Sequence, residues 1–124
     1  MIKKMFPLML LAAFLAGCAT TTITNLTPTQ YPRNPSGQYL VEMQIDSEQK
    51  TLRPESVKPY VVVGNQSYPM AQTRKTSNRW EAMIPLASDK TGIAFHYKVD
   101  YQYNKFGKPG EGTIRSPDYP LVVK

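Results

Sequence analysis

Hydrophobic and polar residues alternate along much of the chain. The longest such stretch covers residues 93–103, in which every second position is apolar or aromatic: Ile93, Phe95, Tyr97, Val99, Tyr101 and Tyr103. Successive side chains of a β-strand point to opposite faces, so a period of two predicts a strand with one buried face. Residues 39–46 repeat the pattern, with Tyr39, Val41, Met43 and Ile45 on the apolar side.

Shorter segments predict further strands. Residues 57–63 form a β-branched run, and Gly64-Asn65-Gln66 supplies a turn after it. Residues 67–72 are then expected to return as the hairpin partner. The next strand carries Trp80, Ala82 and Ile84 on one face and ends at Pro85. We expect Trp80 to point inward and to fill the core.

The two ends of this region contain weaker strand signals. Ile23 and Leu26 are expected to form a first edge strand within a polar segment rich in Thr, Pro and Asn. Residues 104–112 hold three glycines and a proline, which predicts a flexible hairpin loop. A strand over 113–115 follows it, and residues 121–123 add a final edge segment.

This pattern predicts an all-β protein. Eleven prolines and the lack of apolar residues at helical spacing argue against helices. About seven short strands within about 100 residues are typical of an antiparallel β-sandwich of the immunoglobulin or fibronectin type III kind. We assign this sandwich to residues 37–124. The chain has a single cysteine, so the sandwich would lack the inter-sheet disulfide.

Two neighbouring segments also resemble a known group of domains. Residues 80–86 read Trp-Glu-Ala-Met-Ile-Pro-Leu, and residues 95–99 read Phe-His-Tyr-Lys-Val. The early-set immunoglobulin-like domains attached to sugar-acting enzymes similarly carry a tryptophan strand that ends in proline, followed by a strand containing Tyr-Lys. The resemblance covers about 20 residues, and it implies a fold rather than a function.

The first 17 residues have a different character. Lys3 and Lys4 give a positive start, and residues 5–15 form an apolar run interrupted by Pro7. A charged start, an apolar middle and small residues at the exit are the parts of a secretory signal peptide. The run is shorter than the roughly 20 residues that a membrane-spanning helix needs. Residues 1–17 are therefore predicted to be a cleaved signal peptide.

The tetrapeptide Leu15-Ala16-Gly17-Cys18 resembles the lipobox of bacterial lipoproteins. In that family a diacylglyceryl group is attached to the cysteine sulfur, and the chain is cut before the cysteine. The resemblance implies lipid attachment at Cys18, with residues 18–36 as lipidated N-terminus, tether and first edge strand. Because Ala19 and not Asp follows, the sorting rule of enteric bacteria implies the outer membrane. The alternative is an ordinary signal peptide with an incidental cysteine.

Charge adds little to this interpretation. The chain has 15 Lys and Arg, of which Lys3 and Lys4 leave with the signal peptide, and 9 Asp and Glu, so the mature part carries +4. Its densest basic spot is Arg74, Lys75 and Arg79. The charges form no basic stripe of the kind that nucleic-acid-binding proteins carry, so no nucleic-acid partner is expected.

The sequence offers few groups for catalysis. His96, the single histidine, falls on the polar side of the long strand and is expected to be solvated. Glu42 and Asp46 share one polar face, where we expect them to be solvated surface residues. The spacings of a nucleophile elbow, a phosphate loop and a calcium loop are absent from the sequence. We therefore predict a protein that is not an enzyme and that uses no cofactor and no metal.

Aromatic residues provide the remaining clue. Eight tyrosines, four phenylalanines and a tryptophan are many for this length. They can fill the core or form stacking platforms for sugars, and the sequence leaves both open. Phe106 differs, because it lies between Lys105 and Lys108 in a glycine-rich loop where an apolar residue has little reason to be buried. Lys105, Phe106 and Lys108 are our candidate contact loop.

The predicted product is an outer-membrane lipoprotein that presents a non-catalytic β-sandwich. We expect it to be a binding or structural accessory module of the cell envelope, held to the membrane through Cys18 and contacting an envelope protein. Two alternatives remain open at this point. One is a carbohydrate-binding surface lipoprotein, and the other is an inhibitor or shielding lipoprotein.

Overall fold

The computed structural model describes residues 21–124. The predicted signal peptide, the lipobox and Cys18 lie outside this range. The described chain consists of strands and one 3-10 turn, η1, in the order β1 (Thr21–Asn25), β2 (Gln30–Tyr31), β3 (Gln38–Ser47), η1 (Pro54–Ser56), β4 (Lys58–Val63), β5 (Gln66–Pro69), β6 (Ala71–Gln72), β7 (Arg79–Pro85), β8 (Gly92–Tyr103), β9 (Gly110–Arg115) and β10 (Tyr119–Val123).

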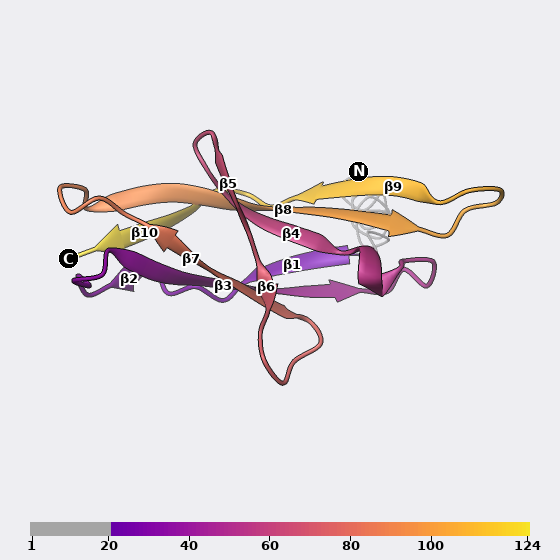
Figure 1. The fold of residues 1–124 in the computed structure, drawn as a ribbon, viewed down its shortest axis with the longest axis horizontal. Coiled ribbons are helices and arrows are strands. Elements are labelled where there is room, and N and C mark those ends of the chain that lie inside the picture. Colours follow the sequence, from indigo (N-terminus) through magenta and orange to yellow (C-terminus); the bar gives the residue numbers. More distant parts are fainter. Residues whose placement is uncertain (1–20) are drawn as a thin grey trace, which may run out of the picture.

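The strands form two sheets that pack face to face (Figure 1). The first sheet has the order β1-β3-β7-β6. The second has the order β2-β10-β8-β4-β5, and β9 pairs with the far half of β8. All pairings are antiparallel except that of β2 with β10.

This strand order is that of an immunoglobulin domain. In chain order, β1, β3, β6 and β7 take the places of strands A, B, D and E, and β4, β5 and β8 take those of C, C′ and F. Strand G is divided into β9 and β10, which pair with successive halves of β8 on the same side. The predicted all-β, immunoglobulin-like sandwich is thus confirmed.

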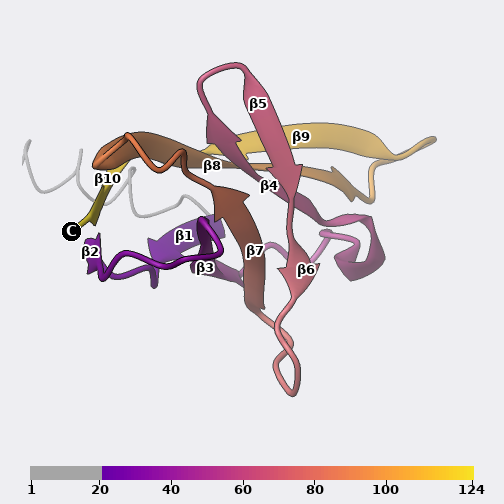
Figure 2. The same ribbon diagram turned by 60° about the vertical axis from the view of Figure 1, so that its left-hand side comes forward.

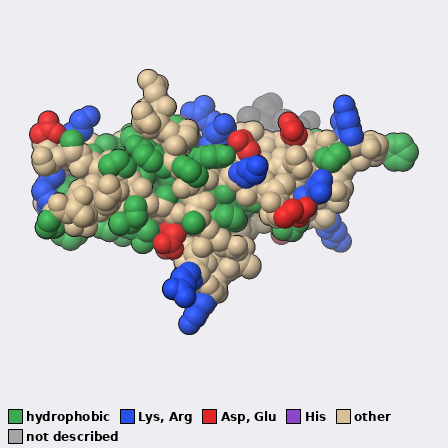
Figure 3. Space-filling view, in the orientation of Figure 1, with side chains coloured by type: hydrophobic (Ala, Val, Ile, Leu, Met, Phe, Trp, Pro, Cys, Tyr) green, Lys and Arg blue, Asp and Glu red, His purple; other side chains and the backbone are tan. Residues whose placement is uncertain are grey.

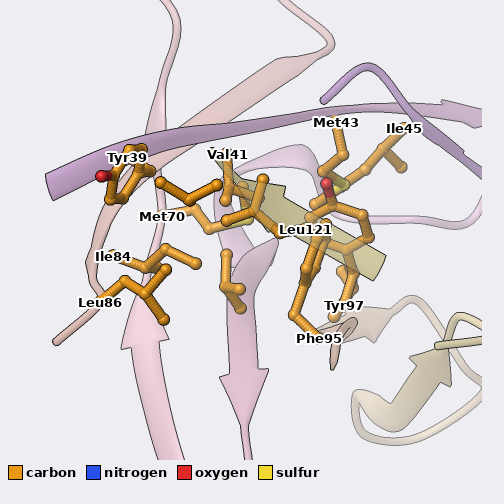
Figure 4. Packing of buried hydrophobic residues seen from close by; sticks show 13 residues of the cluster. Tyr39, Val41, Met43, Ile45, Met70, Ile84, Leu86, Phe95, Tyr97 and Leu121 are labelled. Atoms are coloured by element: carbon orange, nitrogen blue, oxygen red, sulfur yellow. The ribbon is translucent and has the colours of Figure 1, made fainter. Parts of the chain in front are cut away.

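The core follows from the period-two pattern. Phe95, Tyr97 and Val99 of β8 are buried against Val41 and Met43 of β3 (Figure 4). Ile84, Val61, Leu121 and Val123 complete the centre of the cluster from the neighbouring strands. The predicted apolar faces of residues 39–46 and 93–99 are therefore the two walls of the core, whereas Tyr101 and Tyr103 lie beyond it.

The prediction of one return strand over residues 67–72 was wrong in part. Only β5 pairs with β4; the chain then crosses to the other sheet, where β6 pairs with β7 (Figure 2). Met70 lies at the crossing, buried between the sheets, and its backbone N–H donates to the Pro59 carbonyl at 3.0 Å. Burial of the Met70 side chain stabilises the crossing, which a period-two pattern alone does not reveal.

Trp80 does not fill the centre of the core as predicted. It is half-buried at the end of the sandwich, where it lines a small cavity of about 120 Å³ with Ile45, Leu52 and Val57. Its strand points the side chain inward, as expected, but Trp80 is the second residue of β7, where it pairs with Met43. The large ring therefore closes the open end of the sandwich, and Tyr97 and Phe95 fill its middle.

A polar network ties the two sheets together through Tyr97. Its buried hydroxyl donates its single proton to the Asn25 Oδ1 (2.6 Å) or to the Glu42 carbonyl (3.0 Å), and it lies 3.0 Å from the Thr27 Oγ1. Burial raises the pKa of this hydroxyl, which favours its neutral, donating form. Antibody domains join strands B and F by a disulfide. Here a hydrogen bond from Tyr97 on β8 to Glu42 on β3 links the same two strands.

The N-terminal polar segment contributes to both sheets. β1 pairs with β3 from Thr21↔Ser47 to Asn25↔Met43, so Ile23 faces Ile45. Leu26 follows the end of this strand. β2 then joins the second sheet beside β10. Thr27 lies between β1 and β2, and its hydrogen bonds to Glu42 and Tyr97 hold the point where the chain changes sheets.

Candidate functional site

The β8–β9 hairpin extends beyond the rest of the sandwich (Figure 1). Its loop, residues 104–109, is exposed throughout. Phe106 has an exposed fraction of 104%, so its ring makes no burying contact. Figure 3 shows a hydrophobic side chain at this far end of the molecule, with basic side chains nearby. A ring left in water forgoes about 1.5–3 kcal/mol of burial free energy.

Two tyrosines brace the hairpin. Tyr101 pairs with Gly112 and Tyr103 with Gly110 across the two strands. A Cβ atom on Gly112 would lie 2.5 Å from the Tyr101 Cζ, and one on Gly110 would lie 2.4 Å from the Tyr103 Cζ. Each ring therefore lies directly over a glycine, an arrangement that compensates the poor packing of glycine in a strand.

The sequence predicted a flexible loop that includes Gly110 and Gly112, but both glycines belong to strand β9. β9 begins at Gly110, three residues before the predicted strand. The missing side chains make room for the tyrosine rings, which fixes the register. The sequence does contain a signal for this pairing. Tyr101 and Tyr103 before the loop are two residues apart, and so are Gly110 and Gly112 after it.

The segment between β3 and β4 supports the hairpin from its other side. Leu52 bridges to Tyr103, and the Asn104 N–H donates to the Thr51 carbonyl at 2.7 Å. The Gln102 N–H donates to the Ser56 Oγ at 2.7 Å. At the base of the hairpin β8 is thus bonded on both of its edges, to β9 and to residues 51–56, so Phe106 is held at the end of a braced arm.

A polar groove of about 720 Å³ lies on the outer face of the second sheet, next to the base of the arm. Tyr60 lines it, together with charged residues from several elements: Arg53, Glu55, Lys58, Lys98, Asp100 and Glu111. Two ion pairs lie inside it, Lys98–Asp100 at 3.7 Å and Arg53–Glu55 at 3.1 Å. The groove is therefore a mixed-charge surface with two half-buried aromatic residues, Tyr60 and Tyr101.

The polar residues considered for chemistry are dispersed. His96 was expected to be solvated, but its side chain is only 13% exposed and its Nδ1 lies 3.4 Å from the Asp118 Oδ1. Asp118 lies in the segment between β9 and β10. Glu42 accepts from the Thr73 hydroxyl at 3.2 Å, whereas Asp46 accepts from Gln44 and Asn78.

Most aromatic rings on strands are packed. Phe95, Tyr97 and Tyr119 stack among themselves with centroid separations of 5.5–5.9 Å, and Tyr101 lies 6.2 Å from Tyr103. Phe106 is the one large aromatic that is fully exposed among residues 21–124.

Two other large apolar side chains are exposed in the described chain. Leu40 of β3 and Met83 of β7 are 37% and 52% exposed. They lie opposite each other in the first sheet and line a groove of about 340 Å³ with Tyr31, Pro32 and Pro35. This groove is at the end of β3 away from Ser47, so the two exposed apolar features are at opposite ends of the sandwich.

Two further observations concern residues 21–124. No cluster of three His, Cys, Asp or Glu side chains is close enough to hold a metal ion in this part of the chain. The same residues include no helix with the length and apolar character to cross a membrane.

Comparison with known proteins adds a structural likeness. No family model matches the chain, and no curated protein matches it. Among solved structures, that of murine CRIg is similar over 83% of this chain and 98% of that chain, with 16% sequence identity and a TM-score of 0.45. The strand order, rather than this likeness, establishes the immunoglobulin topology described above.

Proposed function

We propose that this protein is a lipoprotein of the bacterial cell envelope, anchored through Cys18 to the outer membrane. It presents a non-catalytic immunoglobulin-like domain that works as a binding or structural module in contact with another envelope component. The observation that carries the proposal is the position of the lipobox. Its cysteine is separated from the first strand of a complete sandwich by Ala19 and Thr20 alone.

The surface of the domain supports a role in contact. The charged side chains of the outer groove pair with one another at Lys98–Asp100 and Arg53–Glu55, as expected of a solvated face. By contrast, Phe106 is held away from the core on a braced hairpin. An apolar side chain that a rigid element keeps exposed is ready to bind without further ordering. We therefore assign the contact surface to the hairpin loop with Lys105, Phe106 and Lys108.

Substitution of Cys18 tests the anchor. Cys18→Ser is expected to abolish incorporation of labelled palmitate, because serine lacks the sulfur that accepts the diacylglyceryl group. The variant should accumulate as a precursor that retains residues 1–17, which a gel resolves from the mature chain. Ala19→Ser is the matched control and should be labelled and cut like the wild type. Equal labelling of Cys18→Ser and the wild type would contradict the proposal.

The polar groove favours a second candidate function, the binding of a saccharide. Sugar sites combine an aromatic ring with polar side chains, and Tyr60 lies beside Lys58, Lys98 and Asp100 in this groove. On this hypothesis Tyr60→Ala should lower affinity for a cell-wall polysaccharide at least tenfold on a glycan array, whereas Tyr68→Ala on the neighbouring edge strand should not. Absence of binding by the wild-type domain would eliminate this candidate.

A further inference from the structure

The entry point of the chain and the hairpin arm belong to the same end of the sandwich. β1 begins at Thr21, whose Oγ1 lies 2.9 Å from the Oγ of Ser47, the last residue of β3. The segment that leaves Ser47 bridges through Leu52 to Tyr103 at the base of the hairpin. The anchored end of the domain is therefore the end that carries Phe106.

The chain between this end and the lipid is short. Ala19 and Thr20 alone separate Cys18 from Thr21. Fully extended residues span at most about 3.6 Å each, so three residues reach about 11 Å. Given the anchor proposed above, on which this inference rests, Thr21 lies close to the headgroups. A tilt of the domain then brings its projecting arm against the same lipid surface.

The tip of the arm has the chemistry of a membrane interface. Phe106 is fully exposed, and Lys105 and Lys108 beside it are exposed as well. The nearest acidic residue along the chain is Glu111, on β9. An aromatic ring enters the boundary between headgroups and acyl chains, and lysines next to it are attracted to lipid phosphates.

A second basic projection leaves the sandwich near the middle of its long axis (Figure 1). The turn between β6 and β7 carries Arg74 and Lys75, and Arg79 opens β7 opposite Gln44 of β3. All three are exposed, and Figure 3 shows basic side chains at the end of a projection. The exposed groove at Leu40 and Met83, at the opposite end, is lined by one cation, Arg33, whose guanidinium donates to the Ser88 and Lys90 carbonyls.

We infer that the hairpin tip is a second, non-covalent membrane contact: Phe106 inserts into an anionic lipid surface while Lys105 and Lys108 bind its phosphates. This contact fixes the tilt of the domain relative to the membrane. The polar groove and the Leu40–Met83 groove then remain available to other envelope components.

A tethered domain tests the contact independently of lipidation at Cys18. Residues 21–124 contain both sheets and the core cluster that they enclose, so we expect this domain to fold without the preceding segment, which circular dichroism checks first. It is held by an N-terminal histidine tag on vesicles with a nickel-chelating lipid, made of phosphatidylcholine with or without phosphatidylglycerol. The reporter is Phe106→Trp in a Trp80→Phe background. The matched control is Met83→Trp in the same background, because Met83 is exposed at the opposite end.

On anionic vesicles, Phe106→Trp should shift its emission to the blue and be quenched by spin-labelled lipid several-fold more than Met83→Trp. Added Lys105→Gln and Lys108→Gln, or high salt, should reduce this quenching toward that on neutral vesicles. Equal quenching at both positions, or no response at Phe106, would overturn the inference. A thiol fluorophore on Phe106→Cys repeats the test without a change at Trp80, because residues 21–124 contain no cysteine. The palmitate test at Cys18 separately decides the anchor.

Discussion

Tyr97→Ala is expected to lower the free energy of unfolding by about 3–5 kcal/mol, the range typical of removing a buried aromatic ring. Tyr97 is fully buried and packs edge-on against Phe95, with ring centroids 5.5 Å apart. The substitution also removes the hydroxyl that bonds Asn25 and the Glu42 carbonyl. Urea unfolding, followed by the fluorescence of Trp80, measures the loss as a lower midpoint at an unchanged slope.

Tyr97→Phe separates the hydroxyl from the ring. We expect a loss of about 1–3 kcal/mol, because the buried Thr27 and Asn25 oxygens lose a partner while the core stays filled. Burial raises the pKa of Tyr97 above its usual 10.0. The contribution of the Tyr97 hydroxyl to the free energy of unfolding is therefore complete below pH 10 and declines as the pH rises further. The difference between the wild type and Tyr97→Phe should therefore narrow above pH 10. Equal urea midpoints for the wild type and Tyr97→Phe at pH 7 would show that the hydrogen bonds of the Tyr97 hydroxyl add nothing to stability.

Gly112→Val is expected to destabilise the domain by about 1–3 kcal/mol, as overpacking does elsewhere. Strand propensity alone predicts the opposite, since valine is favoured in strands and glycine is not. The Cβ of a residue at this position would lie 2.5 Å from the Tyr101 Cζ, so the ring must leave its place. Amide hydrogen exchange should accelerate for residues 101–103 and 110–113, which pair in the arm.

Glu111→Val is the matched control, because its side chain points to the opposite face of the same strand and is exposed. It should be neutral or slightly stabilising. If Gly112→Val unfolded at the same urea concentration as Glu111→Val, the tyrosine–glycine brace would be irrelevant to the rigidity of the arm. Phe106 would then have no fixed support.

The long alternating strands were predictable because one buried face imposes a period of two. Residues 93–103 and 39–46 lie in the two facing sheets, so their apolar positions face each other across the core. The crossing at Met70 was not predictable in this way. A chain that changes sheets buries one residue between two short strands, and that leaves no periodic signal.

The environment of single residues depended on neighbours far along the chain. Trp80 has the inward orientation that its pattern predicts, but it lies at the start of β7 and is half-buried. His96 contacts Asp118, 22 positions away, which no local pattern indicates. For the candidate loop, the sequence located Lys105, Phe106 and Lys108. The braced arm below them depends on pairing across the hairpin.

The most direct test of the lipid anchor is the mass of the N-terminal peptide of the protein isolated from its native membrane. Trypsin should release a peptide from Cys18 to Arg33, since no lysine or arginine lies between them. We expect this peptide to begin at Cys18 and to exceed its amino-acid mass by a diacylglyceryl group, with or without an amide-linked acyl chain. A peptide that begins elsewhere, or one that begins at Cys18 without added mass, would contradict the account.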